Sequence, residues 1–409
     1  MPKIIFVNRV YWPSTQATAQ ILRDLTVALA SAGLNVQVIT STPLSGDYRD
    51  EITNLEVLRT SKETTAKTNL LAKFCSYSRF LKSTRHVLGA ILRKNDVVVA
   101  MTDPPMLGAN IAPLVRDKGG EMWHWSQDLY PEVALAIKPF GVFTKLLEIY
   151  KRRRNAEWRK AKGIVAIGCD MKQRIVQNGI SDSKVLVSAN WAPRDLKTTE
   201  PNLQRTKWNV PTDSFVISYS GNLGRAHVLT PILDLVDALK AETCIHTVIV
   251  GHGAQKNALK TQAHDRLLER CIFQDPVPIS ELGNSLSAAD IHLITMRPDC
   301  VGTVWPSKFY GIIAAQRPIV FIGPKSAEVA SLIAKHELGI AVEPSDIVRA
   351  ADFIAKLAGD PKLQLEFRGK IGEFAKQQAG LDDAIALWTN VACPQRFESE
   401  SVATRPKNA

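Results

Sequence analysis

Short apolar runs alternate with helical patterns along the whole chain. In the first half, strand-sized apolar runs fall at Ile4–Val7, Val36–Thr40, Leu55–Leu58, Val97–Met101, Met122–Trp125, Ile164–Ile167 and Val185–Val187. In the second half, they fall at Phe215–Ser220, Thr247–Val250, Cys271–Gln274, Ile291–Thr295, Ile319–Ile322 and Ile340–Val342. Amphipathic stretches such as Ala17–Ser31 and Pro231–Ala241 separate them. Strand–helix alternation predicts parallel sheets covered by helices, and two such sets predict an α/β chain of two Rossmann-like domains.

A polar stretch without periodicity, residues 190–210, separates the two sets and is typical of a linker. We therefore expect an N-terminal domain at 1–194 and a C-terminal domain at 195–375. A last helical pattern predicts a C-terminal helix at 376–393, and the polar residues 394–409 are typical of a disordered tail.

The composition is that of an ordinary soluble globular protein. The chain has 409 residues, of which 45% are hydrophobic and 22% charged. No apolar run is long enough to span a membrane, and the first residues lack the pattern of a signal peptide. The six cysteines form no C-x-x-C pair, and no two aspartates stand at D-x-D spacing. The sequence therefore suggests no zinc site and no disulfide framework, and we expect no metal.

The positive charge is unevenly distributed. The formal net charge is +11, and residues 1–195 hold all of it, with 28 bases against 17 acids. Two blocks, residues 64–95 and 145–162, carry this excess. A basic nucleic-acid-binding protein is one interpretation, but two patches without a recognition motif do not favour it.

The first basic block also carries an apolar pattern. Between residues 70 and 92, apolar side chains recur at helical spacing with bases between them: Leu70, Phe74, Tyr77, Leu81, Leu88 and Ile91. A basic amphipathic helix suits an anionic membrane surface. The alternative is a helix that packs on its own sheet and exposes a solvated basic face.

Glycines follow two strands of the second half. The segment FVISYSGNLGRAH contains Gly221 and Gly224 and is followed by Arg225, while TVIVGHG ends in Gly251 and Gly253. Glycines at strand ends let backbone amides approach a phosphate closely. Each could equally be a structural glycine in a tight turn, and the combination is more informative than either motif alone.

The stretch TVWPSKFYGIIAAQRPIVF, residues 303–321, predicts a short helix that ends at Pro318 and is followed by a strand. Ser307 is placed to cap the helix by accepting from free backbone amides. Lys308 would then lie where the first turn favours negative charge, which predicts an anion site. An ordinary loop–helix–strand unit is the alternative.

The order YSGNLG, VGHG and GTVWPSKFYGIIAAQRPIVFIG resembles glycosyltransferase family 4, of the GT-B fold. The similar branch adds sugars to lipid-linked intermediates of bacterial surface polysaccharides, such as lipopolysaccharide. In the N-terminal half YWPSTQAT, MTDPP and HWSQDLYPEVA are similar to that branch, so the resemblance covers roughly residues 2–390. It implies two domains facing a cleft, with the C-terminal helix crossing back to the N-terminal domain.

The resemblance also implies roles for residues. A nucleoside-diphosphate-sugar, with uridine as the expected base, would bind the C-terminal domain, and the acceptor would bind the N-terminal domain. The implied donor-binding residues are Gly221, Asn222, Gly224, Arg225, Gly251, Gly253, Thr303, Ser307 and Lys308. Candidate catalytic residues are Asp103, Asp128, Glu132 and Asp299, of which the first three could orient an acceptor hydroxyl or merely cap turns, while Asp299 could bind the transferred sugar.

This chain departs from the family pattern at three positions. The family carries two glutamates where Thr303 and Gly311 stand here, and a glycine is usual at Gln316. The ribose contact of the second glutamate therefore cannot be carried over.

We thus expect a metal-independent hexosyltransferase without a cofactor, acting with retention of anomeric configuration. It would work in the cytoplasm, peripherally on the inner face of the cell membrane, on a polyprenyl-diphosphate-linked glycan. A nucleotide-sugar epimerase on the same fold is the main alternative. A dinucleotide oxidoreductase is disfavoured because VNRVYWP, not G-x-G-x-x-G, follows the first strand.

Overall fold

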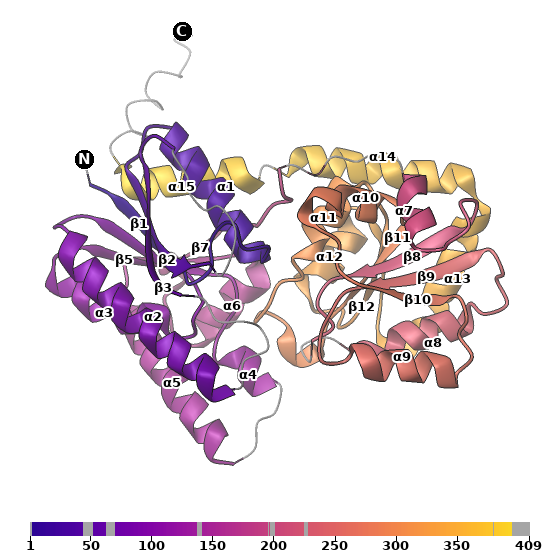
Figure 1. Cartoon of the computed structure of the whole chain (residues 1–409), viewed down its shortest axis with the longest axis horizontal. Coiled ribbons are helices and arrows are strands. Elements are labelled where there is room, and N and C mark those ends of the chain that lie inside the picture. The colour runs from indigo at the N-terminus through magenta and orange to yellow at the C-terminus, as the bar shows by residue number, and fades with distance from the viewer. Residues whose placement is uncertain are drawn as a thin grey trace, which may run out of the picture. The chain divides into compact units, whose positions relative to one another are not determined.

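The computed structural model describes residues 2–43, 52–62, 70–136, 141–194, 196, 201–224, 228–378 and 380–394. They form two compact units. Unit 1 holds the described residues up to Asn190 and those from Gly380 onward, and unit 2 runs from Trp191 to Gln378. Each unit is a parallel sheet covered by helices, so the predicted α/β class with two Rossmann-like units is confirmed (Figure 1).

Unit 1 is built on a seven-stranded parallel sheet of order β3-β2-β1-β4-β5-β6-β7. Its strands are β1 (Ile4–Val7), β2 (Val36–Thr42), β3 (Leu55–Lys62), β4 (Val97–Ala100), β5 (Glu121–Ser126), β6 (Gly163–Ala166) and β7 (Val185–Val187). Its helices are α1 (Ala17–Ser31), α2 (Leu70–Ile91), α3 (Leu107–Asp117), α4 (Glu132–Ala136), α5 (Val142–Lys160), α6 (Cys169–Gln177) and α15 (Gly380–Ala392). Figure 1 shows α2, α3 and α5 on one face of this sheet and α1 beside α15 on the other.

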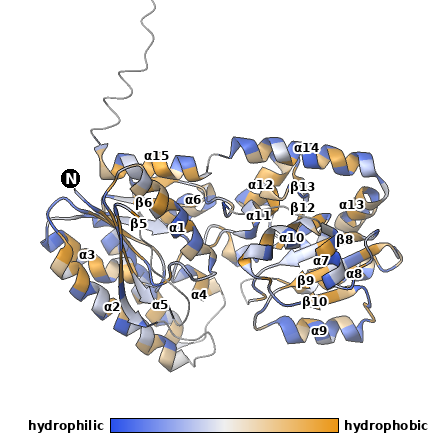
Figure 2. Ribbon diagram, turned by 45° about the horizontal axis from the view of Figure 1, so that its top comes forward, coloured by the Kyte–Doolittle hydropathy of each residue, from blue (hydrophilic) through white to orange (hydrophobic). Residues whose placement is uncertain are grey.

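Unit 2 is built on a six-stranded parallel sheet of order β10-β9-β8-β11-β12-β13. Its strands are β8 (Phe215–Ser220), β9 (Ile245–Val250), β10 (Cys271–Gln274), β11 (Ile291–Thr295), β12 (Ile319–Ile322) and β13 (Gly339–Val342). Its helices are α7 (Pro201–Lys207), α8 (Thr230–Ala238), α9 (Lys256–Asp265), α10 (Leu282–Ser287), α11 (Lys308–Ala314), α12 (Glu328–Lys335), α13 (Ile347–Gly359) and α14 (Pro361–Gln377). Figure 2 shows hydrophilic and hydrophobic residues alternating along the helices that cover both sheets.

The strand order fixes where ligands can approach. In each sheet the order reverses at one point, between β1 and β4 in unit 1 and between β8 and β11 in unit 2. The loops after these two strands leave in opposite directions, which opens a crevice at the carboxyl ends of the strands. Functional side chains are therefore expected at these two switch points.

The C-terminal helix α15 belongs to unit 1. Its Trp388 is fully buried, and the ring centroid lies 5.5 Å from that of Phe6 and 5.7 Å from that of Trp125. Both partners lie on strands of the unit 1 sheet, so a buried aromatic cluster fixes α15 there. Residues 395–409, where a disordered tail was expected, lie outside the described residues.

Two local features of the structure bear on these expectations. The apolar side of α2 faces its own sheet, with Phe80 and Leu88 in the core. The expected linker contains α7, because the buried Arg205 donates to the carbonyl oxygens of Ala288, Thr212 and Ser214 and thereby fixes this segment on unit 2.

Candidate active site

The loops after β8 and β9 pack backbone against backbone. A Cβ atom at Gly251 would lie 2.0 Å from the carbonyl oxygen of Gly221, and one at Gly253 would lie 2.5 Å from the Leu223 backbone. Gly253 also has a φ of +151°, which L side chains rarely adopt. Backbone packing therefore requires glycine at both positions, and this packing holds the two loops together at the carboxyl edge of the sheet.

Lys308 reaches into this edge from the start of α11. Its Nζ is buried and has no hydrogen-bond partner among the described residues. Nζ lies 3.4 Å from the centroid of the Tyr219 ring, and a Cβ at Gly221 would be 3.2 Å from it. Burial lowers the pKa of Lys308 to about 7. A buried ammonium that packs on a ring face and has no hydrogen-bond partner among the described residues favours an anionic ligand.

Ser307 does not cap α11 as the sequence predicted. It is the N-cap residue, but its side chain makes no capping hydrogen bond. The reason is its backbone conformation, φ −53° and ψ −26°, which is already helical, whereas a capping residue is extended. Its side chain is instead exposed.

The remaining predicted donor-binding residues have different surroundings. Asn222 is exposed, and Gly224 accepts a hydrogen bond from the Gln255 side chain at its carbonyl oxygen. Thr303 is fully buried and donates from Oγ1 to the Cys300 carbonyl at 2.9 Å, so its hydroxyl is used within its own turn. Arg225 lies outside the described residues.

Asp299 follows β11 and is half exposed, and its carboxylate lies 3.6 Å from the Arg297 guanidinium. The two departures after it are also accommodated locally. Gln316 has a φ of +53°, a conformation that explains why glycine is usual there, and its side chain packs against Gly372 of α14. Gly311 is buried, and a Cβ there would lie 3.2 Å from Leu286 Cδ1.

The switch point of unit 1 is closed by an ion pair. Arg9 follows β1 and Asp103 follows β4, and the guanidinium binds the carboxylate in a bidentate manner, Nε to Oδ1 at 3.0 Å and Nη2 to Oδ2 at 2.7 Å. Sequence reasoning missed Arg9. The signal was the basic residue in VNRVYWP directly after the first strand, which had been used only to disfavour a dinucleotide site.

Asp128 follows β5 beside this pair. Burial and, second, the charge of Asp103 raise the pKa of Asp128 to about 6. Burial and the charge of Asp128 in turn raise the pKa of Tyr130 to about 12. A carboxyl group whose pKa is raised toward neutrality can exchange a proton near physiological pH, as a general base must.

Asp128 and Tyr130 line a small pocket of about 30 Å³ at the carboxyl ends of β4 and β5. His124 lines the same pocket, and its imidazole is held against Gly108, where a Cβ would come within 2.3 Å of the ring. Burial lowers the pKa of His124 to about 3, so this side chain is neutral. Asp128 is therefore the titrating group of this pocket near neutral pH.

Glu132 is engaged in a buried ion pair. Its Oε1 accepts from Arg154 Nη2 at 2.7 Å and from Asn178 Nδ2 at 2.9 Å, and Arg154 Nη1 binds its Oε2. Arg154 in turn stacks on the Trp158 ring. These contacts hold α4 against α5 and favour a structural role for Glu132, whose contact with an acceptor stays a prediction.

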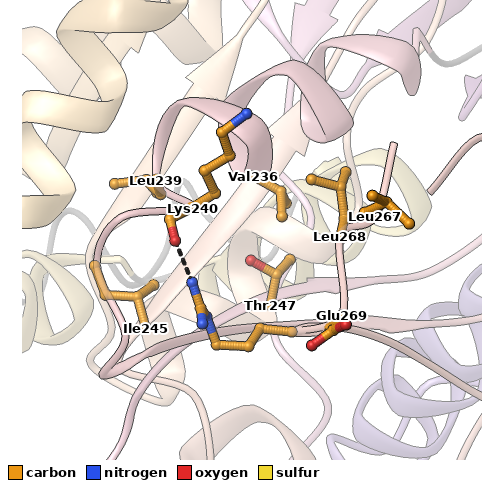
Figure 3. Close-up of a pocket in the computed structure, with 9 residues that line it drawn as sticks. Val236, Leu239, Lys240, Ile245, Thr247, Leu267, Leu268 and Glu269 are labelled. Atoms are coloured by element: carbon orange, nitrogen blue, oxygen red, sulfur yellow. Dashed lines mark hydrogen bonds between the residues drawn. The ribbon is translucent and has the colours of Figure 1, made fainter. Parts of the chain in front are cut away.

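A further pocket of unit 2 lies elsewhere. It has a volume of about 220 Å³ and is lined by apolar side chains such as Val236, Leu239 and Leu268 (Figure 3). It sits at the amino ends of β9 and β10, whereas ligands of such sheets bind at the carboxyl ends. We do not assign it to the reaction. The described residues hold no group of three or more His, Cys, Asp or Glu side chains that could bind a metal.

Comparisons with known proteins agree with this geometry. Residues 202–378, nearly all of unit 2, match the family model "Glycosyl transferases group 1". The chain is 28% identical over 332 residues to the probable glycosyltransferase WbjE of Pseudomonas aeruginosa, with 80% of each chain covered. The chain is a glycosyltransferase with the GT-B fold.

Further relatives of this glycosyltransferase cover both units. It is 21% identical over 364 residues to the putative colanic acid biosynthesis glycosyl transferase WcaI of Escherichia coli K12, covering 84% of this chain and 89% of the relative. Anabaena Alr3699/HepE in complex with UDP-glucose superposes with a TM-score of 0.71 at 14% identity, covering 96% of this glycosyltransferase and 99% of HepE. At that identity the likeness establishes the fold alone.

Proposed function

We propose that the enzyme transfers a hexosyl group from a UDP-sugar to a polyprenyl-diphosphate-linked glycan during synthesis of a bacterial surface polysaccharide. The name of the relative WcaI refers to colanic acid biosynthesis, which supports the pathway class. HepE binds UDP-glucose, which supports the uridine base. The observation that carries the proposal is the buried Lys308 ammonium beside Gly221, because it offers positive charge at the switch point of unit 2.

In this proposal unit 2 binds the donor. The Lys308 ammonium binds the distal phosphate, and the amides of the Gly221–Gly224 loop approach the diphosphate. During transfer the bond between the anomeric carbon and the phosphate oxygen breaks, and its electron pair leaves on UDP. Lys308 stabilises the charge that develops on this leaving group. Asp299 would contact the transferred sugar, since it follows β11, the strand that also precedes Lys308 in the chain.

Unit 1 binds the acceptor. The acceptor oxygen forms the new bond to the anomeric carbon, and its proton passes to the Asp128 carboxylate, which later releases it to solvent. The ionised form of Asp128 is required, so transfer should decline as the pH falls through about 6. We expect retention of anomeric configuration on the strength of the resemblance to family 4, and no metal.

Unit 1 also offers a surface for the lipid. Exposed bases lie along α2 and α5: Lys73, Arg79, Lys82, Arg85, Lys145, Arg152 and Arg153. Because α2 turns its apolar side inward, its contribution is mainly electrostatic, with Phe74 as the exposed exception at 63%. Within the described part of the chain no helix is long and apolar enough to cross a bilayer.

Apolar contact would come from α5. Phe143, Leu146 and Ile149 are 65%, 40% and 58% exposed, and their spacing of three residues places them on one side of the helix. Arg153 follows Ile149 by four residues and falls on the same side. Apolar side chains among bases suit an anionic lipid surface, where the apolar side chains insert and the bases bind headgroups. We propose that this surface holds the enzyme on the inner face of the cell membrane.

A transfer assay tests the function directly. Purified enzyme is incubated with labelled UDP-sugars and a lipid extract that contains polyprenyl-diphosphate-linked glycans, and the label is followed into the organic phase. We expect lipid-bound label, lost in Lys308→Met and reduced roughly 100-fold or more in Asp128→Asn. Label that stays in water as a different nucleotide sugar would instead identify an epimerase and refute transfer.

A further inference from the structure

Tyr219 contacts both parts of the proposed diphosphate site in unit 2. It lies on β8, two residues before Gly221, and its side chain is fully buried. The Lys308 ammonium lies over the face of its ring, with Nζ 3.4 Å from the ring centroid. At the other end of the ring, the phenolic hydroxyl donates to the Asn222 carbonyl oxygen at 3.2 Å. One side chain thus connects the start of α11 with the glycine loop.

The glycine loop is itself fixed to the neighbouring strand, because the Gly221 N–H donates to the Val250 carbonyl oxygen at 2.9 Å. Gly221 also leaves room for the lysine, since a Cβ there would lie 3.2 Å from both Cε and Nζ of Lys308. The end of the Lys308 side chain therefore lies against Tyr219 and Gly221, two residues at the carboxyl end of β8. This contact sets the position of the ammonium relative to the backbone amides of the loop.

The ring holds the ammonium without neutralising it. Burial raises the pKa of Tyr219, so this side chain is a neutral phenol. Burial also lowers the pKa of His292 on β11 to about 4, so this imidazole is neutral as well. A ring face attracts a cation through its quadrupole, and the N–H groups of Nζ that point away from the ring stay available to a ligand. A carboxylate in the same place would form an ion pair and compete with a phosphate for the ammonium.

We propose that Tyr219 is a positioning residue that holds the Lys308 ammonium beside the glycine loop, where it meets the distal phosphate of the nucleotide. The inference rests on the proposed function, in which Lys308 binds that phosphate. Tyr219 touches neither the nucleotide nor the sugar in this scheme and acts through Lys308. It should therefore strengthen the binding of UDP and leave unchanged the binding of UMP, which lacks the distal phosphate.

Titration calorimetry of the whole protein with UDP and with UMP tests the role of the ring. Tyr219→Leu should weaken UDP binding roughly 5–30-fold, as expected for the loss of a desolvated cation–π contact, and should not change UMP binding. Tyr219→Phe keeps the ring and loses only the hydroxyl, so its UDP affinity should stay closer to the wild type. Phe353→Leu is the matched control and should not change UDP binding, because this ring of α13 packs on Phe367 of α14, 5.5 Å between centroids.

A double variant separates positioning from a merely structural role. In the Lys308→Met background, Tyr219→Leu should cause no further loss of UDP affinity, because the ring has no ammonium left to hold. NMR of the ligand-free enzyme with ¹³C-labelled lysine gives a second readout. The Lys308 pKa should fall by about one unit in Tyr219→Leu, since the ring favours the charged form. An equal loss of UMP binding, or an undiminished loss of UDP binding in the Lys308→Met background, would overturn the proposal.

The same variants distinguish the role of Tyr219 from the proposed function. If Tyr219→Leu lowers the Lys308 pKa but the wild type binds no nucleotide, the proposed donor site fails while the contact that holds the ammonium stands. If the wild type binds UDP and Tyr219→Leu changes neither the UDP affinity nor the Lys308 pKa, the donor site stands and the positioning role is overturned. Tyr219→Met, which fills more of the space without a ring, gives the same test if Tyr219→Leu folds poorly.

Discussion

The two switch points of this enzyme have the same topology and opposite electrostatics. In unit 1, the side chains after β1 and β4 neutralise each other, as Arg9 binds Asp103, and the titrating group beside them is the acid Asp128. In unit 2, glycines follow β8 and a buried ammonium, Lys308, comes after β11. In the proposed function, one fold thus presents a proton acceptor in one unit and an anion site in the other, and the difference lies in a few loop residues rather than in the sheets.

The largest effect should come from removing the buried charge of unit 2. Burial lowers the Lys308 pKa from 10.5 to about 7. At pH 7 the Lys308 side chain therefore holds its proton more firmly in the unfolded chain than in the folded one. Stability should therefore rise with pH between about 7 and 10.5. Lys308→Met should abolish this rise and stabilise the free enzyme by about 4 kcal/mol at pH 7, as measured by denaturant unfolding. Equal stability of variant and wild type would mean that the ammonium is solvated.

The acid of unit 1 gives a dependence at lower pH. The pKa of Asp128 is raised from 3.8 to about 6, so the folded state pays for ionisation that the unfolded state makes freely. The free energy of unfolding should therefore fall as the pH rises from about 4 to 6, and it should stay at the lower value above pH 6. Asp128→Asn should remove that fall, worth about 3 kcal/mol, in unfolding curves recorded across this range. A fall of the same size in the variant would assign it to another group.

The packing of the unit 2 loops can be tested with a matched pair of glycines. Gly251→Ala places a Cβ 2.0 Å from the Gly221 carbonyl oxygen, so the loops must separate, at a cost of about 2 kcal/mol or more and with loss of nucleotide binding. Gly369→Ala on α14 meets nothing within 4 Å and should stabilise the helix by about 0.5–1 kcal/mol. Thermal unfolding distinguishes them, and a neutral Gly251→Ala would contradict the packing described.

The smallest effect concerns the lipid surface of unit 1. Ile149→Ser removes an exposed apolar side chain from α5 and should weaken binding to vesicles with anionic headgroups by roughly 3–10-fold, measured by sedimentation. Leu365→Ser is the control, because Leu365 is 66% exposed on α14 of unit 2. If both variants bind vesicles like the wild type, α5 does not insert.

Much of the fold followed from the periodicity of apolar residues. Every strand of both sheets was predicted, and most of them because parallel strands buried on both faces are continuous apolar runs. The edge strands β3 and β7 are only partly buried. Helix α7 was not predicted, since its short polar sequence is fixed by tertiary contacts of Arg205. The inward packing of α2 was equally hidden, because an amphipathic helix has the same pattern whether it faces a sheet or a membrane.

The site was predictable where a motif required a backbone conformation. Gly251 and Gly253 stood out in the sequence because only glycine permits their close approach. Lys308 was singled out as a phosphate ligand at a capped helix start, whereas the structure buries its ammonium against Tyr219 and the Ser307 side chain makes no capping hydrogen bond. Arg9 could not be recognised, since its meaning depends on Asp103, a residue 94 positions away that is brought beside it only by the order of the strands.

Titration calorimetry with UDP and GDP, on the wild type and Lys308→Met, tests the central claim most directly. The account predicts micromolar binding of UDP that chelation of metals does not change. Lys308→Met should weaken it roughly 10–100-fold, the worth of a charge-assisted hydrogen bond, while Lys335→Met on α12 should not. Equal UDP affinity in the wild type and Lys308→Met would contradict the assignment of the unit 2 switch point as the diphosphate site.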